Sequence, residues 1–196
     1  MQVENTLFRN PGVSIFFHMK ELTILKYPDP RLRKKADEVI NIDREIEDLI
    51  KAMFRIMKDE DGIGLAAPQV GVSKRVIAVS LESKGFERLA LINPVIQWLS
   101  KEKDFVEEGC LSVPGVRAEV ERSVDAVVKG MVKSGRLVEI TAHGLLARVL
   151  QHEIDHLDGV LFIDRLSEEE RRRVVGELSS LEKQYSPLSI NPSCKS

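Results

Sequence analysis

Hydrophobic residues recur with a helical period in three segments of the chain. The first predicted helix covers Asn41–Lys58, and its apolar face is formed by Ile42, Ile46, Leu49, Ile50, Met53 and Met57. The second covers Leu145–Leu157 and the third covers Ser167–Tyr185. Glu170 follows Ser167 by three residues, which is the pattern of a capping box, so we expect the third helix to begin there.

Segments rich in Val and Ile predict β-strands. The expected strands are Leu22–Tyr27, Arg75–Leu81, Leu89–Trp98, Val116–Lys129 and Leu137–Ala142. Residues 59–74 are rich in Gly and Pro and predict a loop, whereas residues 133–136 predict a hairpin turn. This order of elements predicts an α+β fold, with mixed or antiparallel β-sheets around a central helix and with an N-terminal and a C-terminal helix.

Length and composition indicate a globular protein, with 196 residues, of which 43% are hydrophobic and 31% charged. We place a single domain at residues 19–185. Residues 1–18 are expected to be an extension, or to arise from an upstream start codon, and residues 186–196 to form a flexible tail.

The charge balance excludes several classes of partner. Twenty-nine basic and 31 acidic residues give a net charge of -2, which provides no electrostatic footprint for DNA or for an anionic membrane. No apolar run is long enough to cross a bilayer. The two cysteines, Cys110 and Cys194, do not make a disulfide framework, so we expect a reducing, cytoplasmic setting.

The clearest chemical signal is the run His152-Glu153-Ile154-Asp155-His156 in the second helix. Histidines four residues apart lie on one helix face, so both imidazoles can bind one metal ion. The glutamate beside the first histidine is then placed to move a proton to and from a metal-bound water. The alternative is an exposed helix that binds nothing, but two of the chain's four histidines fall in this motif. The motif therefore predicts a metal-dependent hydrolase.

An apolar stripe continues this face toward the N-terminus of the helix. Leu145, Val149, His152 and His156 are spaced by four, three and four residues. The spacing predicts that Leu145 and Val149 lie beside the metal and form a dry wall for a hydrophobic group of the substrate. Both side chains also suit the core, and the two interpretations are compatible for one helix.

A catalytic metal usually has three protein ligands and one open position, so a third ligand has to be found. In one zinc-protease motif it would be a later histidine, but Phe162 stands at that position. Glu177 is the candidate from a later helix, where a solvated face is the better explanation, and His143 is better explained as a surface residue. Cys110 remains, either as a thiolate ligand or as a small buried hydrophobe.

Three segments resemble the signature motifs of the peptide deformylase family and occur in the same order. They are Gly62–Gln69, Glu108–Ser112 and His152–His156, and Tyr27–Arg33 is also similar to the N-terminal region of that family. The resemblance covers roughly residues 20–167, with no departure at the motif positions. Three separate motifs make coincidence a poor explanation.

The resemblance implies a reaction and a metal site. It implies removal of the N-formyl group from the initiator methionine of new bacterial proteins, with release of formate. It further implies ligation by Cys110, His152 and His156, with Glu153 as the catalytic acid–base. The metal of such enzymes is often Fe²⁺, which Zn²⁺, Ni²⁺ or Co²⁺ replaces.

The resemblance also suggests how the substrate is held. Gln69 and the backbone N–H of Leu111 would polarise the formyl oxygen, and Glu108 would contribute to substrate binding. The backbone of Ile63 and Gly64 could pair with an extended peptide as an added strand, although a flexible turn is the plainer explanation of this loop. The methionine side chain would enter the pocket beside the apolar stripe.

Two other functions compete with this hypothesis. A zinc endopeptidase shares the helix motif but lacks its usual third ligand here. A non-catalytic protein that binds metal or peptide N-termini would need neither Glu153 nor Gln69. Contact with the ribosome through Arg171–Arg173 is a further hypothesis, for which a solvated helix face is the simpler interpretation.

Overall fold

The computed structural model describes residues 22–81 and 86–185, and it confirms the predicted α+β fold. The segments expected to be an N-terminal extension (1–18) and a C-terminal tail (186–196) lie outside the described residues. In chain order the elements are η1 (Pro30–Arg33), α1 (Arg44–Asp59), β1 (Gly64–Ala66), η2 (Ala67–Val70), β2 (Val76–Leu81), β3 (Phe86–Leu99), β4 (Lys103–Cys110), β5 (Val113–Ser123), β6 (Asp125–Met131), β7 (Leu137–His143), α2 (Leu145–Leu157), η4 (Phe162–Asp164), α3 (Glu168–Arg173) and α4 (Val175–Tyr185).

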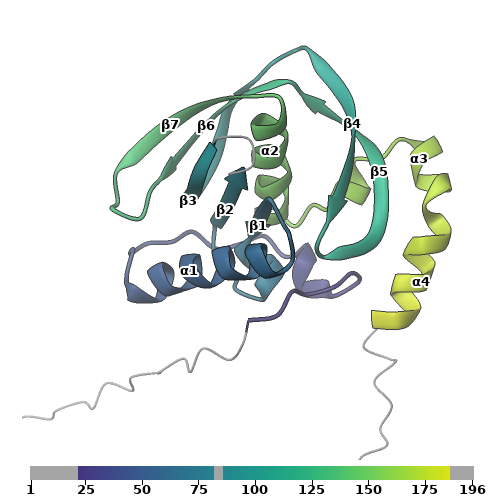
Figure 1. Cartoon of the computed structure of the whole chain (residues 1–196), viewed down its shortest axis with the longest axis horizontal. Coiled ribbons are helices and arrows are strands. Elements are labelled where there is room, and N and C mark those ends of the chain that lie inside the picture. The colour runs from purple at the N-terminus through teal and green to yellow at the C-terminus, as the bar shows by residue number, and fades with distance from the viewer. Residues whose placement is uncertain (1–21, 82–85, 186–196) are drawn as a thin grey trace, which may run out of the picture.

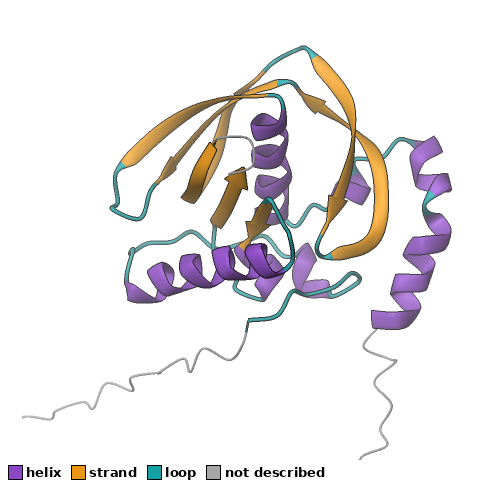
Figure 2. Ribbon diagram, viewed as in Figure 1, coloured by secondary structure: helices purple, strands orange, loops and turns teal. Residues whose placement is uncertain are grey.

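Two antiparallel sheets enclose helix α2 (Figure 1). The larger has the strand order β1-β2-β3-β6-β7, and the smaller is the β4–β5 hairpin. Helix α2 packs against strands of both sheets, α1 against β1 and β2, and α4 against β5. Figure 2 shows α2 between the two sheets, with α1 along one end of the larger sheet. The helix that carries the histidine motif is therefore the central element of the fold.

Helix α1 forms because its apolar residues fall on one face and its first turn is capped. The Asp43 carboxylate accepts a hydrogen bond from the N–H of Ile46, so the helix starts at Arg44, slightly later than predicted. Met53 and Met57 are buried against the sheet. Burying side chains of this size stabilises the fold by about 1.5–3 kcal/mol each.

Helix α2 is buried along almost its whole length, from Ala147 to Leu157. Its apolar residues Leu150, Ile154 and Leu157 pack into the core formed by the larger sheet. The same stretch also carries polar and charged side chains, which are costly to bury without partners. These side chains need hydrogen-bond or ion-pair partners inside the protein, and the residues around the candidate site provide most of them.

The predicted strand Leu22–Tyr27 is wrong. The segment is extended, but its backbone bonds go singly to separate places: the Leu25 N–H donates to the Gln69 carbonyl and the Tyr27 N–H to the Ser112 carbonyl. No regular ladder with one neighbour forms. The predicted loop at 59–74 is also partly wrong, because β1 and η2 lie within it.

Two predicted elements are each divided in the structure. The strand predicted over Val116–Lys129 breaks at Val124, where β5 of the small sheet ends and β6 of the large sheet begins. The helix predicted over Ser167–Tyr185 breaks at Val174, whose buried side chain joins a hydrophobic cluster with residues of β5 and α4. Alternating hydrophobicity continues through Val124, and α3 contains no apolar residue, so the hydrophobic pattern reveals neither break.

The capping box predicted at α3 forms only in part. The Ser167 hydroxyl accepts a hydrogen bond from the Glu170 N–H, as predicted. The Glu170 carboxylate, however, accepts from the Glu119 N–H of β5 at 2.8 Å and pairs with Arg173. A long-range contact has taken the place of the local one and joins α3 to the small sheet. The turn predicted at 133–136 is present, with Gly135 in the left-handed conformation that the turn requires.

Candidate metal centre

The sulfur of Cys110 and one ring nitrogen of each motif histidine converge in the structure. The ligand atoms of Cys110, His152 and His156 all lie within 4.8 Å of one another. The Cys110 Sγ is 3.2 Å from the His156 Nε2. The sequence hypothesis that Cys110 faces the paired imidazoles therefore agrees with the geometry of the chain.

Local structure explains how these three side chains meet. His152 and His156 lie one helical turn apart in α2, and their ring centroids are 5.0 Å apart. Cys110 ends β4, where the ladder with β5 shifts register between Gly109 and Cys110. The shift ends the regular alternation of the hairpin next to the helix. A helix face and a strand end thus form the centre together.

The Glu108 carboxylate fixes the orientation of His152. Its Oε2 accepts a hydrogen bond from Nδ1 of His152 at 2.9 Å, which leaves the other ring nitrogen for the sulfur side. Arg122 donates to both carboxylate oxygens at 2.9 and 3.1 Å, and Arg148 donates to Oε1 at 2.7 Å. Burial opposes ionisation of Glu108, but the bonds from His152 and Arg122 outweigh burial and lower its pKa to about 2.

This network extends through the second carboxylate of the motif. Asp155 accepts from Arg122 at 2.5 Å and from Arg165 at 2.6 Å. Arg148 also pairs with Asp104 of β4. The sequence pattern does not predict Asp155, Arg122 or Arg148 as part of the site. The sequence feature that could have indicated Asp155 is its place inside the histidine motif, where a carboxylate on a buried helix needs a partner.

Glu153 points its carboxylate at the site without a protein partner. Its Oε2 and the Nδ1 of His156 are the buried side-chain atoms without a hydrogen bond among residues 22–81 and 86–185. Burial raises the pKa of Glu153 to about 7. An unpaired buried carboxylate beside a thiol and two imidazoles fits a divalent cation, because this donor set suits Fe²⁺ or Zn²⁺ and the metal would compensate the buried charge.

Gln69 reaches the centre from η2. Its Oε1 accepts from the Ala66 N–H at 2.7 Å, which directs the amide nitrogen toward the Ser112 hydroxyl at 3.2 Å and the Cys110 sulfur at 3.4 Å. Its side chain is almost fully buried. The amide N–H groups therefore face the site, as the hypothesis of a donor to the formyl oxygen requires.

A cavity of about 620 Å³ opens onto the centre. Its walls include every residue that the sequence analysis assigned to the substrate: Ile63, Gly64, Glu108, Leu145 and Val149. Leu145 is 42% exposed and Val149 is 6% exposed, so the apolar stripe passes from the pocket wall into the core. Glu108 lines the cavity, but its carboxylate is 5% exposed and turned toward the arginines. Direct use of that carboxylate by a substrate would compete with those bonds.

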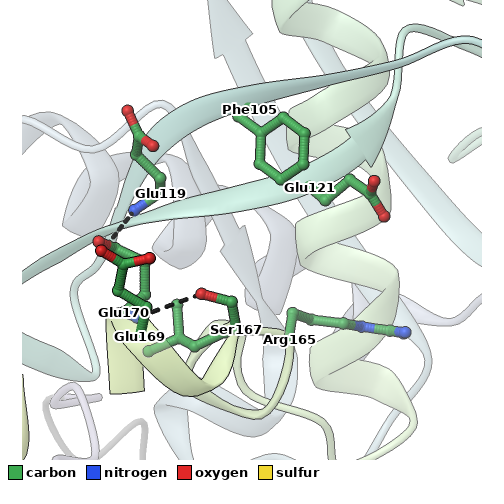
Figure 3. Close-up of a pocket in the computed structure, with 8 residues that line it drawn as sticks. Phe105, Glu119, Glu121, Arg165, Ser167, Glu169 and Glu170 are labelled. Carbon is green, nitrogen blue, oxygen red and sulfur yellow. Dashed lines mark hydrogen bonds between the residues drawn. The ribbon is translucent and has the colours of Figure 1, made fainter. Parts of the chain in front are cut away.

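A second cavity, of about 470 Å³, lies between the β4–β5 hairpin and the start of α3 (Figure 3). The residues along its wall are Phe105, Glu119, Glu121, Arg165, Leu166, Ser167, Glu169 and Glu170. They include neither cysteine nor histidine. Glu170 is held by Arg173 and Glu121 by Lys103, so two of its carboxylates already have partners. Of these two cavities, only the first is lined by cysteine and histidine side chains that could bind a metal ion.

The residues considered as alternative third ligands do not approach the centre as ligands. His143 is exposed and pairs with Asp125 at 2.6 Å. Phe162 stacks on the His152 ring, with centroids 6.2 Å apart. Glu177 is exposed on α4. Arg171, Arg172 and Arg173 all have partners within the protein: the Ile163 carbonyl, Glu168 and Glu170 respectively.

The site combines a strand cysteine with two histidines of one helix at an open pocket, and a buried glutamate without a protein partner lies beside them. Together with the α+β fold, this arrangement defines a metal-dependent hydrolase. The polypeptide deformylase family model matches residues 21–172. The chain belongs to the peptide deformylase family and is a metal-dependent amidohydrolase of that kind.

Relatives and solved structures agree with this assignment. The peptide deformylase of Cellvibrio japonicus is 44% identical over 167 residues, covering 85% of this chain and 97% of the relative. That of Desulforudis audaxviator is 49% identical over 147 residues, covering 75% and 94%. The crystal structure of a peptide deformylase from Legionella pneumophila has a TM-score of 0.76 at 41% identity, covering 84% of this chain and 97% of that one. No helix within the described ranges is long and apolar enough to span a membrane.

Proposed function

We propose that Cys110, His152 and His156 hold one divalent metal ion, at which the chain removes the N-formyl group from the N-terminal methionine of newly made proteins. The activity itself is that of the family. The observation that carries the residue assignment is the convergence of three ligand atoms beside an unpaired buried carboxylate. The products are formate and a peptide with a free amino terminus.

The donor set suits a soft or borderline divalent metal ion. Fe²⁺ is the proposed metal in the cell, with Zn²⁺, Ni²⁺ or Co²⁺ as substitutes. When bound, such an ion supplies Lewis-acid chemistry, lowering the pKa of a water ligand and polarising a carbonyl oxygen. Glu108 holds the His152 ring in the orientation that binding needs, since a hydrogen-bonded carboxylate fixes both tautomer and direction.

Glu153 is the proposed acid–base. Its carboxylate accepts a proton from the attacking water and returns that proton to the nitrogen of the leaving amine. Burial raises the pKa of Glu153, which favours its acceptance of a proton from water. The lack of a protein partner at Oε2 leaves one oxygen available for this exchange.

Two donors stabilise the negative charge that develops on the formyl oxygen. The Gln69 amide and the N–H of Leu111 are the proposed pair, one from η2 and one from the turn after β4. Donors fixed in advance on a partly buried wall lower the barrier because they need not reorganise during the reaction. Removing one such donor costs on the order of 3–4 kcal/mol in comparable enzymes.

The peptide is held along the edge of the larger sheet. Among the described strands, β1 pairs only with β2, so its other edge, beside Gly64 at the cavity, is available to an extended chain. The carbonyl of the neighbouring Ile63, also at the cavity, accepts from the Ser80 N–H of β2 at 2.9 Å. Pairing through the backbone suits substrates whose sequences differ after the first residue. The methionine side chain is proposed to lie against Leu145 and Val149.

The decisive experiment is anaerobic purification, metal analysis and a formate-release assay on a formyl-Met peptide. We expect close to one metal ion per chain and release of formate from the formylated peptide. The same peptide without the formyl group should be left intact. Cleavage of internal peptide bonds without release of formate would instead support the zinc-endopeptidase alternative. Oxygen is excluded because a ferrous–thiolate centre is easily oxidised.

Nascent chains are the proposed substrates, and the cytoplasm is therefore the proposed compartment. Contact with the ribosome through Arg171–Arg173 gains no support from the contacts in the protein: Arg171 and Arg173 bond to protein groups, and Arg172 stays largely exposed, 3.6 Å from Glu168. Co-sedimentation with ribosomes of a chain truncated after Leu166, compared with the full chain, tests that contact. Equal binding of the two chains would dismiss it.

A further inference from the structure

The extended segment Leu25–Tyr27 is hydrogen-bonded to both loops that carry the proposed oxyanion donors. The Leu25 N–H donates to the backbone carbonyl of Gln69 at 2.7 Å, and the Tyr27 N–H donates to the carbonyl of Ser112 at 2.7 Å. Between these two, the Lys26 ammonium donates to the carbonyl of Leu111 at 2.8 Å. Three consecutive residues thus connect η2 with the turn after β4.

The Leu111–Ser112 peptide group is held from both sides. Its carbonyl accepts from Lys26, and its N–H, on Ser112, lies 3.4 Å from the Cys110 sulfur. A cation on the carbonyl polarises the peptide and makes its N–H a better donor to the sulfur. With this peptide plane fixed, the preceding one, which contains the Leu111 N–H, has little freedom left.

We infer that Lys26 is a positioning residue for deformylation, which sets the direction of the Leu111 N–H relative to the Gln69 amide. This inference rests on the proposed roles of Gln69 and Leu111. Lys26 lines the cavity, yet its ammonium donates to the backbone carbonyl of Leu111 and not to a ligand of the metal. Its effect on the reaction is therefore indirect, through the placement of a donor.

The side chain is the part of this connection that substitution can remove. The bonds made by Leu25 and Tyr27 use the backbone and persist in side-chain variants. Lys26→Met keeps a stem of similar length and removes the donor, whereas Lys26→Arg keeps a cationic donor. Lys35→Met is the control, because Lys35 is an exposed lysine beyond η1, outside the segment Leu25–Tyr27.

The test compares steady-state kinetics on a formyl-Met peptide with metal content and thermal stability. Lys26→Met should lower kcat about 10-fold, less than the ~100- to 1,000-fold loss expected when an oxyanion donor is removed outright. KM and metal content should stay within about twofold, because a placement effect acts mainly in the transition state. Lys26→Arg should recover most of kcat, and Lys35→Met should behave as the unmodified protein.

A second measurement uses the metal-free protein. Hydrogen exchange at the amides of Leu111 and Ser112 should be faster in Lys26→Met than in the unmodified protein, and unchanged in Lys35→Met. A purely structural role would instead lower thermal stability and speed exchange throughout the protein. If Lys26→Met fails to fold, Lys26→Gln takes its place. Gln is a shorter, neutral donor, so kcat should also fall in this variant, but by less than about 10-fold.

The inference is overturned if Lys26→Met or its Gln substitute keeps the kcat of the unmodified protein, or loses kcat only in proportion to lost metal or lost folded protein. Activity of the unmodified protein is measured first. No formate from the metal-loaded unmodified protein refutes the proposed function, whereas an active protein with a silent Lys26 substitution refutes only the role of Lys26.

Discussion

Nδ1 of His152 donates a 2.9 Å hydrogen bond to the carboxylate of Glu108, whose own position is set by Arg122 and Arg148. The two arginines and the carboxylate have side chains that are 4–6% exposed. Breaking such a buried arrangement by removing one charge is costly, because the remaining charges lose their compensation. The ring that faces the metal site is therefore held by an ionic cluster that spans β4, β5 and α2.

Glu108→Gln should weaken metal binding about 10- to 100-fold, the usual effect of losing an outer partner of a metal ligand. The amide is neutral, so it accepts less strongly from His152 and leaves Arg122 and Arg148 without their counter-charge. Competition with a chelator measures the metal affinity. Glu107→Gln is the control, because Glu107 is exposed next to it in β4. Equal affinities in the two variants would contradict the assigned role of Glu108.

The sequence predicted the short-range parts of this site well. Two histidines and a glutamate on one turn of helix need only the helical period to be placed, and the structure has them on α2. Cys110 needed chemistry as well as pattern, since it remained after other third ligands were considered. The relation between these residues follows from local geometry, which is why it was visible before the fold was known.

The ionic cluster was not predictable in the same way. Glu107 and Glu108 are adjacent and chemically alike, yet the first is exposed and the second is buried. The difference arises from strand alternation in β4, a strand that the sequence analysis missed because charged residues dominate it. Arg122 and Arg148 find Glu108 only once β5 and α2 have packed on β4. Long-range packing decides these partners, and no local pattern encodes it.

Glu153→Gln should keep the metal and lose most turnover. The amide preserves size but cannot accept and return a proton, so kcat should fall about 10²- to 10⁴-fold. Metal analysis and formate release are measured on the same preparation. Glu139→Gln, at an exposed position of β7, is the control. An unimpaired Glu153→Gln protein would remove Glu153 from the mechanism.

Cys110→Ala should lose the metal. The thiolate is one of three ligands that bind the metal directly. Its removal should therefore weaken metal binding by more than ~100-fold, the largest usual effect of removing a residue that only hydrogen-bonds a ligand. Metal content after dialysis checks this result. Cys194→Ala, at the other cysteine of the sequence, should keep its metal. If Cys110→Ala retained one ion per chain at unchanged affinity, another residue would have to be the third ligand.

Gly64→Ala should impair catalysis with little loss of stability. A Cβ at this position would overlap the Glu153 carboxylate, approaching its Cδ to 2.9 Å and the Cγ1 of Val149 to 3.0 Å. The carboxylate would have to move, and a displacement of about 1 Å costs up to ~100-fold in rate. Gly176→Ala is the control, because nothing lies within 4 Å of its added Cβ. A Gly64→Ala protein with normal kcat would show that the Glu153 carboxylate tolerates displacement.

The hydrogen bond from the Tyr27 hydroxyl to Glu182 should make stability depend on alkaline pH. Burial, followed by the bond to Glu182, raises the pKa of Tyr27 from 10.0 to about 12 in the folded protein. Because the folded pKa lies above the unfolded one, the stabilisation is complete below pH 10 and is lost as the pH rises through about 12.

Tyr27→Phe should lower the free energy of unfolding by about 1 kcal/mol at neutral pH, the usual net contribution of one hydrogen bond. It should also flatten the decline between about pH 10 and 12. Denaturant unfolding at several pH values measures both effects. Glu182→Ala should add little to Tyr27→Phe, since both changes break the same contact between α4 and the N-terminal segment. Fully additive losses would mean that the two side chains stabilise the protein independently.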